Sequence, residues 1–265
     1  MFIDVLIAIF FFLVGLEIRH GLKDLNSAIV PIVAALGGMI FPALIFLAIN
    51  PGSHMWATAM PTDIALALGV VSLLGKRVQP HVRIFLLTLA IADDLFSLIV
   101  LGLFYGDELH PEKAFATLGA AALGVLLPLT KSQLNKAITA LSPISTYFIV
   151  PVIIAVNIPL NIDLASFTSQ TTIALVIARG IGKIVGIALF AWIAIKLGAK
   201  SNVHLKEIAG VGALAGMGMT VSLVIAEIAA KSESELNEVR LGLFISAILS
   251  GLLGYLWLRR TPASK

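Results

Sequence analysis

The chain has 265 residues, of which 59% are hydrophobic and 12% are charged, and its mean hydropathy is +1.03. Soluble domains usually contain about 45–50% apolar and about 25% charged residues, so this composition excludes an ordinary cytosolic enzyme or a nucleic-acid-binding protein. The formal charge of +3 does not by itself indicate an anionic partner, because basic residues in membrane proteins mostly record which loops stay in the cytoplasm. The absence of cysteine excludes disulfides and thiolate chemistry. We predict a polytopic membrane protein.

Nine segments are apolar and long enough, or nearly long enough, to cross a bilayer, which takes roughly 20 residues. In chain order these predicted spans are Phe2–Ile18, Ala28–Ala48, Met55–Leu74, Val82–Phe104, Phe115–Leu129, Ile144–Ile162, Ile173–Leu197, Ile208–Ala230 and Leu241–Leu258. The fifth is the weakest, because it is short and carries Pro128 near its end. We expect a single all-α transmembrane domain over residues 1–265.

The positions of lysine and arginine test this count, since cytoplasmic loops are enriched in them. With nine spans, most basic residues fall on one side, and the other side holds only Lys113, Lys231 and Arg240. Omitting the fifth span would move the lysines after the seventh span to the wrong side. We therefore predict an external N-terminus and a cytoplasmic C-terminus.

Asp93 and Asp94 lie near the middle of the fourth predicted span. An ionisable residue at this depth costs at least about 2.5–3.5 kcal/mol on insertion scales, so it marks a functional site by default. Two adjacent carboxylates cannot both ionise cheaply in a low dielectric, and their oxygen atoms suit sodium, lithium or protons. Competition between a cation and protons for one site is the physical basis of an antiporter. The alternative is a structural pair neutralised by lysine and arginine.

Two predicted spans contain interruptions. In the third, Pro61 breaks the helix just before Thr62 and Asp63, because proline lacks a backbone donor. Asp63 can offset the positive end of the half-helix, and Thr62 can satisfy loose backbone groups. In the eighth, glycines that include Gly216 and Gly218 weaken the helix. The alternatives are a simple proline kink with an interfacial Asp63, and close helix packing at the glycines.

Paired interruptions in corresponding places indicate a transporter site built from inverted repeats. We therefore expect a first core repeat over residues 28–104 and a second, inverted core repeat over residues 171–258. The spans between them, over residues 115–162, are expected to form a scaffold.

Two cations, Arg179 and Lys183, lie within the seventh predicted span and are four residues apart, so both can face one side of the helix. Together with three ionised aspartates they give a net charge of −1, which suits the entry of a small cation. The alternative is that one of them snorkels to an interface, which fits Arg179 better than Lys183. The five histidines fall in loops or at span ends and never group, so a histidine metal site is not expected.

Several motifs resemble the NhaA family of bacterial sodium/proton antiporters, whose fold is built from inverted repeats. The most specific are TDIALALG over residues 62–69 and LAIADD over residues 89–94. Further matches are Phe12–Ile18, Ala34–Ala43, Gly182–Lys183, Gly216–Thr220 and Gly254–Arg259. The resemblance covers nearly the whole chain and implies two crossed, interrupted helices at the centre of an all-α membrane domain.

The resemblance also implies roles. Asp93 and Asp94 would bind the sodium ion and protons, and Lys183 would pair with one of them, Asp93. The remaining site residues would be Asp63 and Thr62 at the helix crossing, Glu17 at the cytoplasmic entrance, and the broken-helix glycines Gly216 and Gly218. No cofactor, enzyme activity or nucleic-acid partner is expected. The implied partners are sodium, lithium, protons and the lipid bilayer of the bacterial inner membrane, and a homodimer is a further implied assembly.

The chain departs from the family in length. The family's first span is missing, and between Tyr105 and Leu118 about two spans, on the order of 40 residues, are absent. The apolar sequence begins at Phe2 without the features of a signal peptide, as if partway through a larger protein. The six core spans remain, so an antiporter is the first hypothesis. The second is a reduced remnant that is transport-incompetent or depends on a partner; a symporter for organic anions fits less well.

Two local departures concern regulation and charge. The stretch Lys136–Pro143 lacks the glutamate and histidines that the family links to pH sensing, so the usual pH regulation is not expected. Arg179 and Ile184 replace an apolar residue and a proline beside the lysine. We expect Arg179 to compete with Lys183 for Asp93 and to weaken proton coupling.

Overall fold

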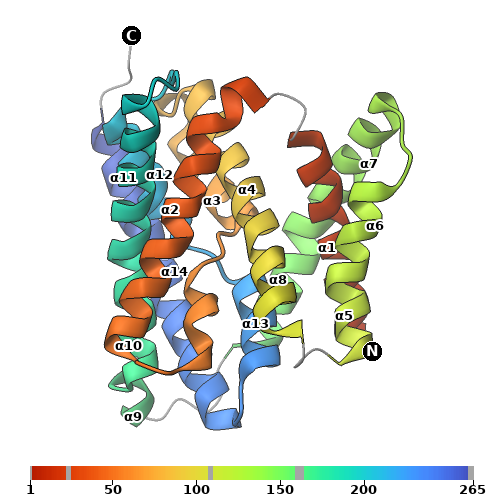
Figure 1. The fold of residues 1–265 in the computed structure, drawn as a ribbon, viewed down its shortest axis with the longest axis vertical. Helices are drawn as coiled ribbons and strands as arrows, with labels where there is room; N and C mark the ends of the chain where they lie inside the picture. Colours follow the sequence, from red (N-terminus) through yellow and green to blue (C-terminus); the bar gives the residue numbers. More distant parts are fainter. Residues whose placement is uncertain (1, 22–24, 107–109, 159–163, 262–265) are drawn as a thin grey trace.

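The structure is a computed structural model that describes residues 2–21, 25–106, 110–158 and 164–261 (Figure 1). The C-terminal residues 262–265, predicted to be cytoplasmic, and the end of the sixth predicted span at residues 159–162 lie outside the described residues. Within them the chain is helical, with no β-strand. The all-α class predicted from the sequence is therefore confirmed.

The helices follow one another with short connections. In chain order they are α1 (Phe2–Gly21), α2 (Leu25–Ile49), η1 (His54–Ala59), α3 (Ile64–Leu74), η2 (Gly75–Arg77), α4 (Pro80–Phe104), α5 (Pro111–Ala114), η4 (Phe115–Gly119), α6 (Ala120–Leu126), α7 (Lys131–Ile144), η5 (Ser145–Ile149), α8 (Val150–Val156), α9 (Leu164–Phe167), α10 (Gln170–Ile177), η6 (Ala178–Gly182), α11 (Lys183–Lys196), α12 (Leu205–Ala215), α13 (Thr220–Ala229) and α14 (Glu233–Arg260). The elements η4, η5 and η6 are π-helical turns that join the α-helices on either side of them into continuous rods.

In the described part of the chain, six helical segments are long and apolar enough to cross a membrane, and the bent pair α12–α13 makes a seventh if it is one span. They are Ala28–Ile49, His54–Leu74, Pro80–Phe104, Lys131–Val156, Gln170–Lys196 and Glu233–Arg260. Two predicted spans do not meet this test: α1 carries Asp4, Glu17 and Arg19, and the rod from Pro111 to Leu126 is too short. The polytopic architecture is confirmed, and the count of nine stays a prediction.

One helix begins earlier than the apolar pattern predicts. The sixth span was expected at Ile144, but the helix begins at Lys131. Thr130 and Gln133 form a capping box that satisfies the free backbone N–H groups of this polar first half. Hydropathy alone cannot detect such a start.

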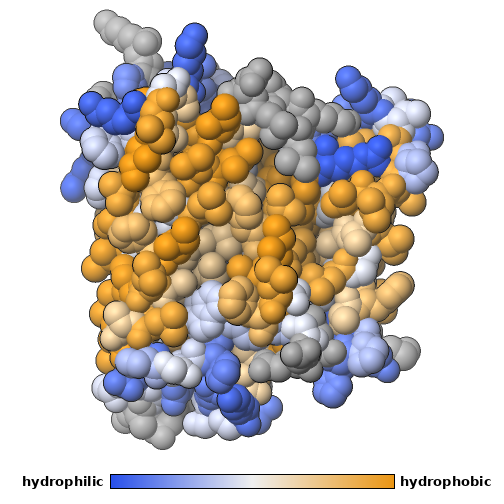
Figure 2. Space-filling view, viewed as in Figure 1, coloured by the Kyte–Doolittle hydropathy of each residue, from blue (hydrophilic) through white to orange (hydrophobic). Residues whose placement is uncertain are grey.

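The rods run roughly side by side between the two ends of the molecule (Figure 1). One group contains α1, α5, α6, α7 and α8; the other contains α2, α10–α11, α12 and α14, with α3 and α4 between them. On the face shown in Figure 2, an apolar belt covers the middle of the molecule, and hydrophilic side chains gather at both ends. The belt matches the exposed apolar side chains that a bilayer would cover, such as Leu44, Leu73 and Leu103.

Both expected interruptions are present. The first separates η1 from α3 at residues 60–63, and the second separates α12 from α13 at residues 216–219, with a bend of 48°. Two clusters of buried apolar residues meet here: Met60 and Met219 belong to one, and Leu214 and Ala215 to the other. The breaks are therefore enclosed by protein, as backbone without helical hydrogen bonds must be at this depth.

Candidate ion-binding site

The two interruptions touch each other. The hydroxyl of Thr62 donates a hydrogen bond to the carbonyl oxygen of Ala215 at 3.1 Å. A Cβ atom on Gly218 would overlap the carbonyl oxygen of Pro61, so only glycine allows the two backbones to approach this closely. The glycines therefore both interrupt the helix and allow close packing, the two alternatives that the sequence left open.

Asp63 joins the N-terminal ends of two half-helices. Its carboxylate accepts a hydrogen bond from the backbone N–H of Ala65 at 3.2 Å, which caps α3. It also accepts from the hydroxyl of Thr220 at 2.7 Å and from the backbone N–H of Thr220 at 3.4 Å, at the start of α13. Because Asp63 is only 4% exposed, the alternative of an interfacial aspartate is wrong. Its negative charge offsets the positive ends of both half-helices.

Asp93, on α4, is paired with Lys183, on α11. The Lys183 ammonium lies 2.9 Å from Oδ2 of Asp93, and both side chains are fully buried. The same ammonium donates to the Thr62 hydroxyl at 2.9 Å and to the Met60 carbonyl. Lys183 therefore connects the aspartate pair to the first interruption, with the pairing that the resemblance implies.

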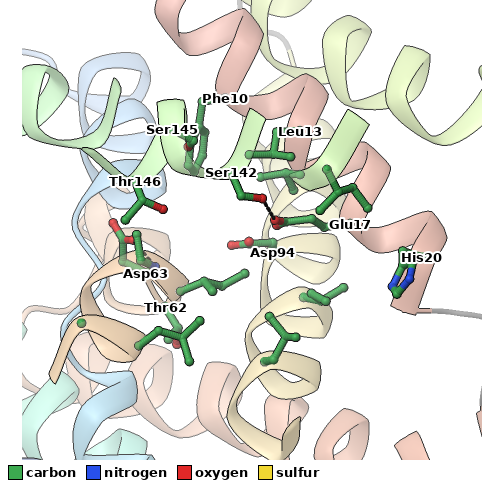
Figure 3. A pocket seen from close by; sticks show the side chains of 18 of the residues that line it. Phe10, Leu13, Glu17, His20, Thr62, Asp63, Asp94, Ser142, Ser145 and Thr146 are labelled. Carbon is green, nitrogen blue, oxygen red and sulfur yellow. Dashed lines mark hydrogen bonds between the residues drawn. The ribbon is translucent and has the colours of Figure 1, made fainter. Parts of the chain in front are cut away.

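Asp94 is buried but lacks such a partner. Among the described residues, its Oδ1 atom has no hydrogen-bond partner, and the same is true of Oδ1 of Asp93. A buried polar oxygen without a partner is rare and costly, so each calls for a ligand. Asp94 lines a cavity of about 600 Å³ into which its carboxylate extends (Figure 3).

The cavity lies between the first group of helices and the pair α3 and α4. Its lining comes from α1, α3, α4, α7 and η5 and includes Thr62, Asp63 and Glu17. Glu17 accepts a hydrogen bond from the hydroxyl of Ser142 at 3.3 Å (Figure 3). His20, near the end of α1, marks the outer rim. The cavity thus leads from the aspartates at mid-depth toward the end of the molecule where α1 and α3 finish.

Arg179 differs from the expectation. It is fully buried, so it does not snorkel to an interface. Its described hydrogen bonds go to backbone carbonyls and a hydroxyl rather than to Asp93, and its expected effect on proton coupling stays a prediction. Its acceptors are the carbonyls of Thr58, Pro61, Gly216 and Gly218 and the hydroxyl of Ser222. Arg179 lies within the π-helical turn η6, directly before Lys183 at the start of α11, and such turns often occur at functional sites.

Three polar partners were not singled out from the sequence: Thr220, which bonds Asp63; Ser142, which bonds Glu17; and Ser222, which bonds Arg179. The role of Thr220 could have been predicted, because it is a hydroxyl residue at the first helical position after the glycine break. The other two are small polar residues in apolar helices, a pattern that does not reveal the partner.

The sequence model of the family described as Na+/H+ antiporter 1 matches residues 1–131 and 114–258 of this chain. The chain belongs to this Na+/H+ antiporter family. The two matched segments overlap at residues 114–131, next to the place between Tyr105 and Leu118 where the sequence predicts the loss of about two spans.

Curated relatives agree with this membership. The Na(+)/H(+) antiporter NhaA 1 of Klebsiella pneumoniae is 33% identical over 318 positions that cover 97% of this chain and 80% of the relative. The Na(+)/H(+) antiporter NhaA of Citrobacter koseri is 32% identical over 317 positions, covering 97% and 82%. The Na(+)/H(+) antiporter NhaA of Escherichia coli O1:K1 is 34% identical over 320 positions, with the same coverage. These alignments are longer than the chain itself, so the relatives carry residues that this chain lacks. The family consists of membrane transporters and not of enzymes, and the chain is a multi-pass member of it.

Proposed function

We propose that the chain exchanges sodium or lithium for protons across the bacterial inner membrane by alternating access, with cation and protons competing for Asp93 and Asp94. The observation that supports this most directly is Oδ1 of Asp94, which has no hydrogen-bond partner among the described residues and belongs to a side chain that lines the cavity. Carboxylate oxygens that can bind either a hard cation or a proton are what an exchanger requires.

Lys183 supplies the compensating charge in this proposal. When a cation binds, Asp93 can turn from the lysine toward the ion and offer it a second carboxylate. The ammonium then keeps the Thr62 hydroxyl and the Met60 carbonyl as acceptors. These two neutral acceptors reduce the cost of leaving the buried ammonium without its carboxylate partner.

The orientation follows from the basic residues. The ends of α1, α3, α6, α11 and α14 lie at one end of the molecule (Figure 1), and His20, near the end of α1, lines the cavity. This end holds the basic residues Arg19, Arg83, Lys131, Lys196 and Arg260. By the positive-inside rule it is the cytoplasmic end, so the cavity is open to the cytoplasm and the C-terminus is cytoplasmic.

The test is ion flux in proteoliposomes that contain only the full chain. We expect a sodium gradient to drive proton movement, and Asp94→Asn to abolish it, because an amide cannot exchange a proton or offer a full negative charge. Glu112→Gln, which removes an exposed carboxylate on α5, is the matched control and should retain flux. Folded wild-type protein without sodium-driven proton flux at any pH would refute the proposal.

The second candidate is the reduced remnant, which the overlapping family matches favour because they indicate a missing scaffold segment. A remnant would still bind sodium at Asp94, and sodium would raise the melting temperature of the wild type but not of Asp94→Asn. It would show no flux when reconstituted alone. Binding with flux excludes this candidate, and binding without flux supports it.

A further inference from the structure

The guanidinium of Arg179 lies in a cage of oxygen atoms between the two interruptions. Its Nη1 atom donates to the Thr58 carbonyl at 2.6 Å and to the Ser222 hydroxyl at 3.0 Å. Its Nη2 atom donates to the Pro61 carbonyl at 2.8 Å and to the Gly218 carbonyl, and its Nε atom to the Gly216 carbonyl at 3.1 Å. All five N–H donors of an arginine can be used in this arrangement.

The carbonyls of the cage come from the broken parts of the backbone. Thr58 and Pro61 lie at the end of η1, and Gly216 and Gly218 lie where α12 ends. Helix ends of this kind present free carbonyls with partial negative charge, and at membrane depth each must have a partner. Converging backbone carbonyls at unwound helix segments are also what transporters use to coordinate alkali cations.

We propose that Arg179 is a tethered cation that fills an alkali-cation site formed by these carbonyls, and that it thereby confines the exchanged ion to the carboxylates at Asp94. This inference rests on the proposed function only for the identity of the exchanged ion. Arginine keeps its charge and cannot give up a proton in a protein, so the cage takes no part in the exchange itself. Arg179 is a positioning and specificity-determining residue.

The glycine at position 218 fits the cage to a guanidinium. A Cβ atom there would lie 2.5 Å from Nη2 of Arg179. The neighbouring cation, Lys183, is bound differently, since one of its partners is a carboxylate that can be protonated. One buried cation thus faces a titratable group, and the other faces carbonyls whose charge does not change.

The proposal predicts that an empty cage binds sodium. We would measure the melting temperature of the purified full chain in sodium chloride and in choline chloride of equal ionic strength. Asp94→Asn serves as the background, because it disables the site proposed for exchange. Asp94→Asn/Arg179→Ala should melt lower in choline, and sodium or guanidinium should raise its melting temperature by on the order of 5 °C.

Three controls separate cage occupancy from ordinary packing. Asp94→Asn alone should not respond to sodium, and neither should its combination with Arg83→Ala, which removes another arginine that donates to a carbonyl, that of Gly75 at 2.6 Å. Asp94→Asn/Arg179→Met should be destabilised without any response, because methionine fills the space with an apolar chain. A purely structural arginine predicts instead that methionine restores more stability than alanine, with no sodium effect in either.

If sodium and guanidinium leave the alanine double variant unchanged relative to Asp94→Asn, the proposal is wrong. If Asp94→Asn/Arg179→Ala is too unstable to melt, we would instead measure the yield of monodisperse protein after extraction in the chloride salt of guanidinium, sodium or choline. Equal yields, or no protein in any of the three salts, would overturn the proposal. Because these experiments report binding, they stand apart from flux: a wild type without flux refutes exchange and leaves the cage to its own test.

Discussion

At the scale of single residues, buried charge is balanced in two different ways. Lys183 faces a carboxylate, a hydroxyl and a carbonyl, whereas the described partners of Arg179 are four carbonyls and a hydroxyl. The sequence allowed both cations to be placed at membrane depth. It did not allow Arg179 to be assigned its partners, because backbone carbonyls have no residue identity and depend on where the helices break.

Replacing Lys183 by alanine tests the first balance. We expect Lys183→Ala to lower the free energy of unfolding by about 3–5 kcal/mol, because Asp93 would remain as a buried charge without its partner. Flux should fall as well. Thermal unfolding in detergent measures the stability, and Lys196→Ala, an exposed lysine on the same helix, is the control. Unchanged melting would mean that Arg179 can leave its carbonyls to pair with Asp93.

At the scale of elements, the pairing of α1 with α6 determines one wall of the cavity. A Cβ atom on Gly124 would overlap the carbonyl oxygen of Phe12, and one on Gly15 would overlap that of Ala121. Two small residues facing each other let the helix backbones approach closely, as is common in membrane proteins. Since α1 also carries Glu17, the spacing of this pair sets the position of the cavity wall.

A larger side chain between α1 and α6 should therefore lower the free energy of unfolding. Gly124→Ala is expected to cost about 1–3 kcal/mol of unfolding free energy, the usual cost of overpacking. Gly102→Ala is the matched control, because a Cβ atom there would meet only a Leu118 methyl group at 3.6 Å. Equal melting temperatures for the two variants would show that α1 and α6 can separate without loss.

The elements differ in how well the sequence predicts them. Both interruptions were located, because proline and glycine break helices for local reasons that the sequence carries. The start of α7 was missed, since its first half is polar and is held by a cap at Thr130 rather than by apolar periodicity. The pairing of Lys183 with Asp93 followed from a resemblance, and the contact of Asp63 with Thr220 became visible only when the two breaks were brought together.

At the scale of the whole molecule, the orientation in the membrane can be measured directly. The chain contains no cysteine, so a single introduced cysteine is a specific label without further changes. Ser132 and Ser234 are both exposed and lie at opposite ends of the molecule, at the starts of α7 and α14.

The proposed orientation predicts which of them faces the outside. A membrane-impermeant maleimide applied to intact spheroplasts should label Ser234→Cys and spare Ser132→Cys until the membrane is permeabilised. Labelling in the reverse order would invert the topology and place the cavity mouth on the external side.

The contacts between the two groups of helices have a mechanical consequence. Near the end of the molecule where α5 and α14 begin, Lys113 of α5 lies 3.5 Å from Glu227 of α13, and Arg240 of α14 donates to Asn157, which follows α8, at 3.2 Å. Elsewhere the cavity separates α1, α7 and η5 from α3 and α4. Arg179, in η6, donates hydrogen bonds to carbonyls of both breaks, so we expect these three segments to move together. In the proposed alternating-access cycle, we expect the opening of this end to break both contacts while the hydrogen bonds of Arg179 persist, so that the helices move against each other along the wall of the cavity.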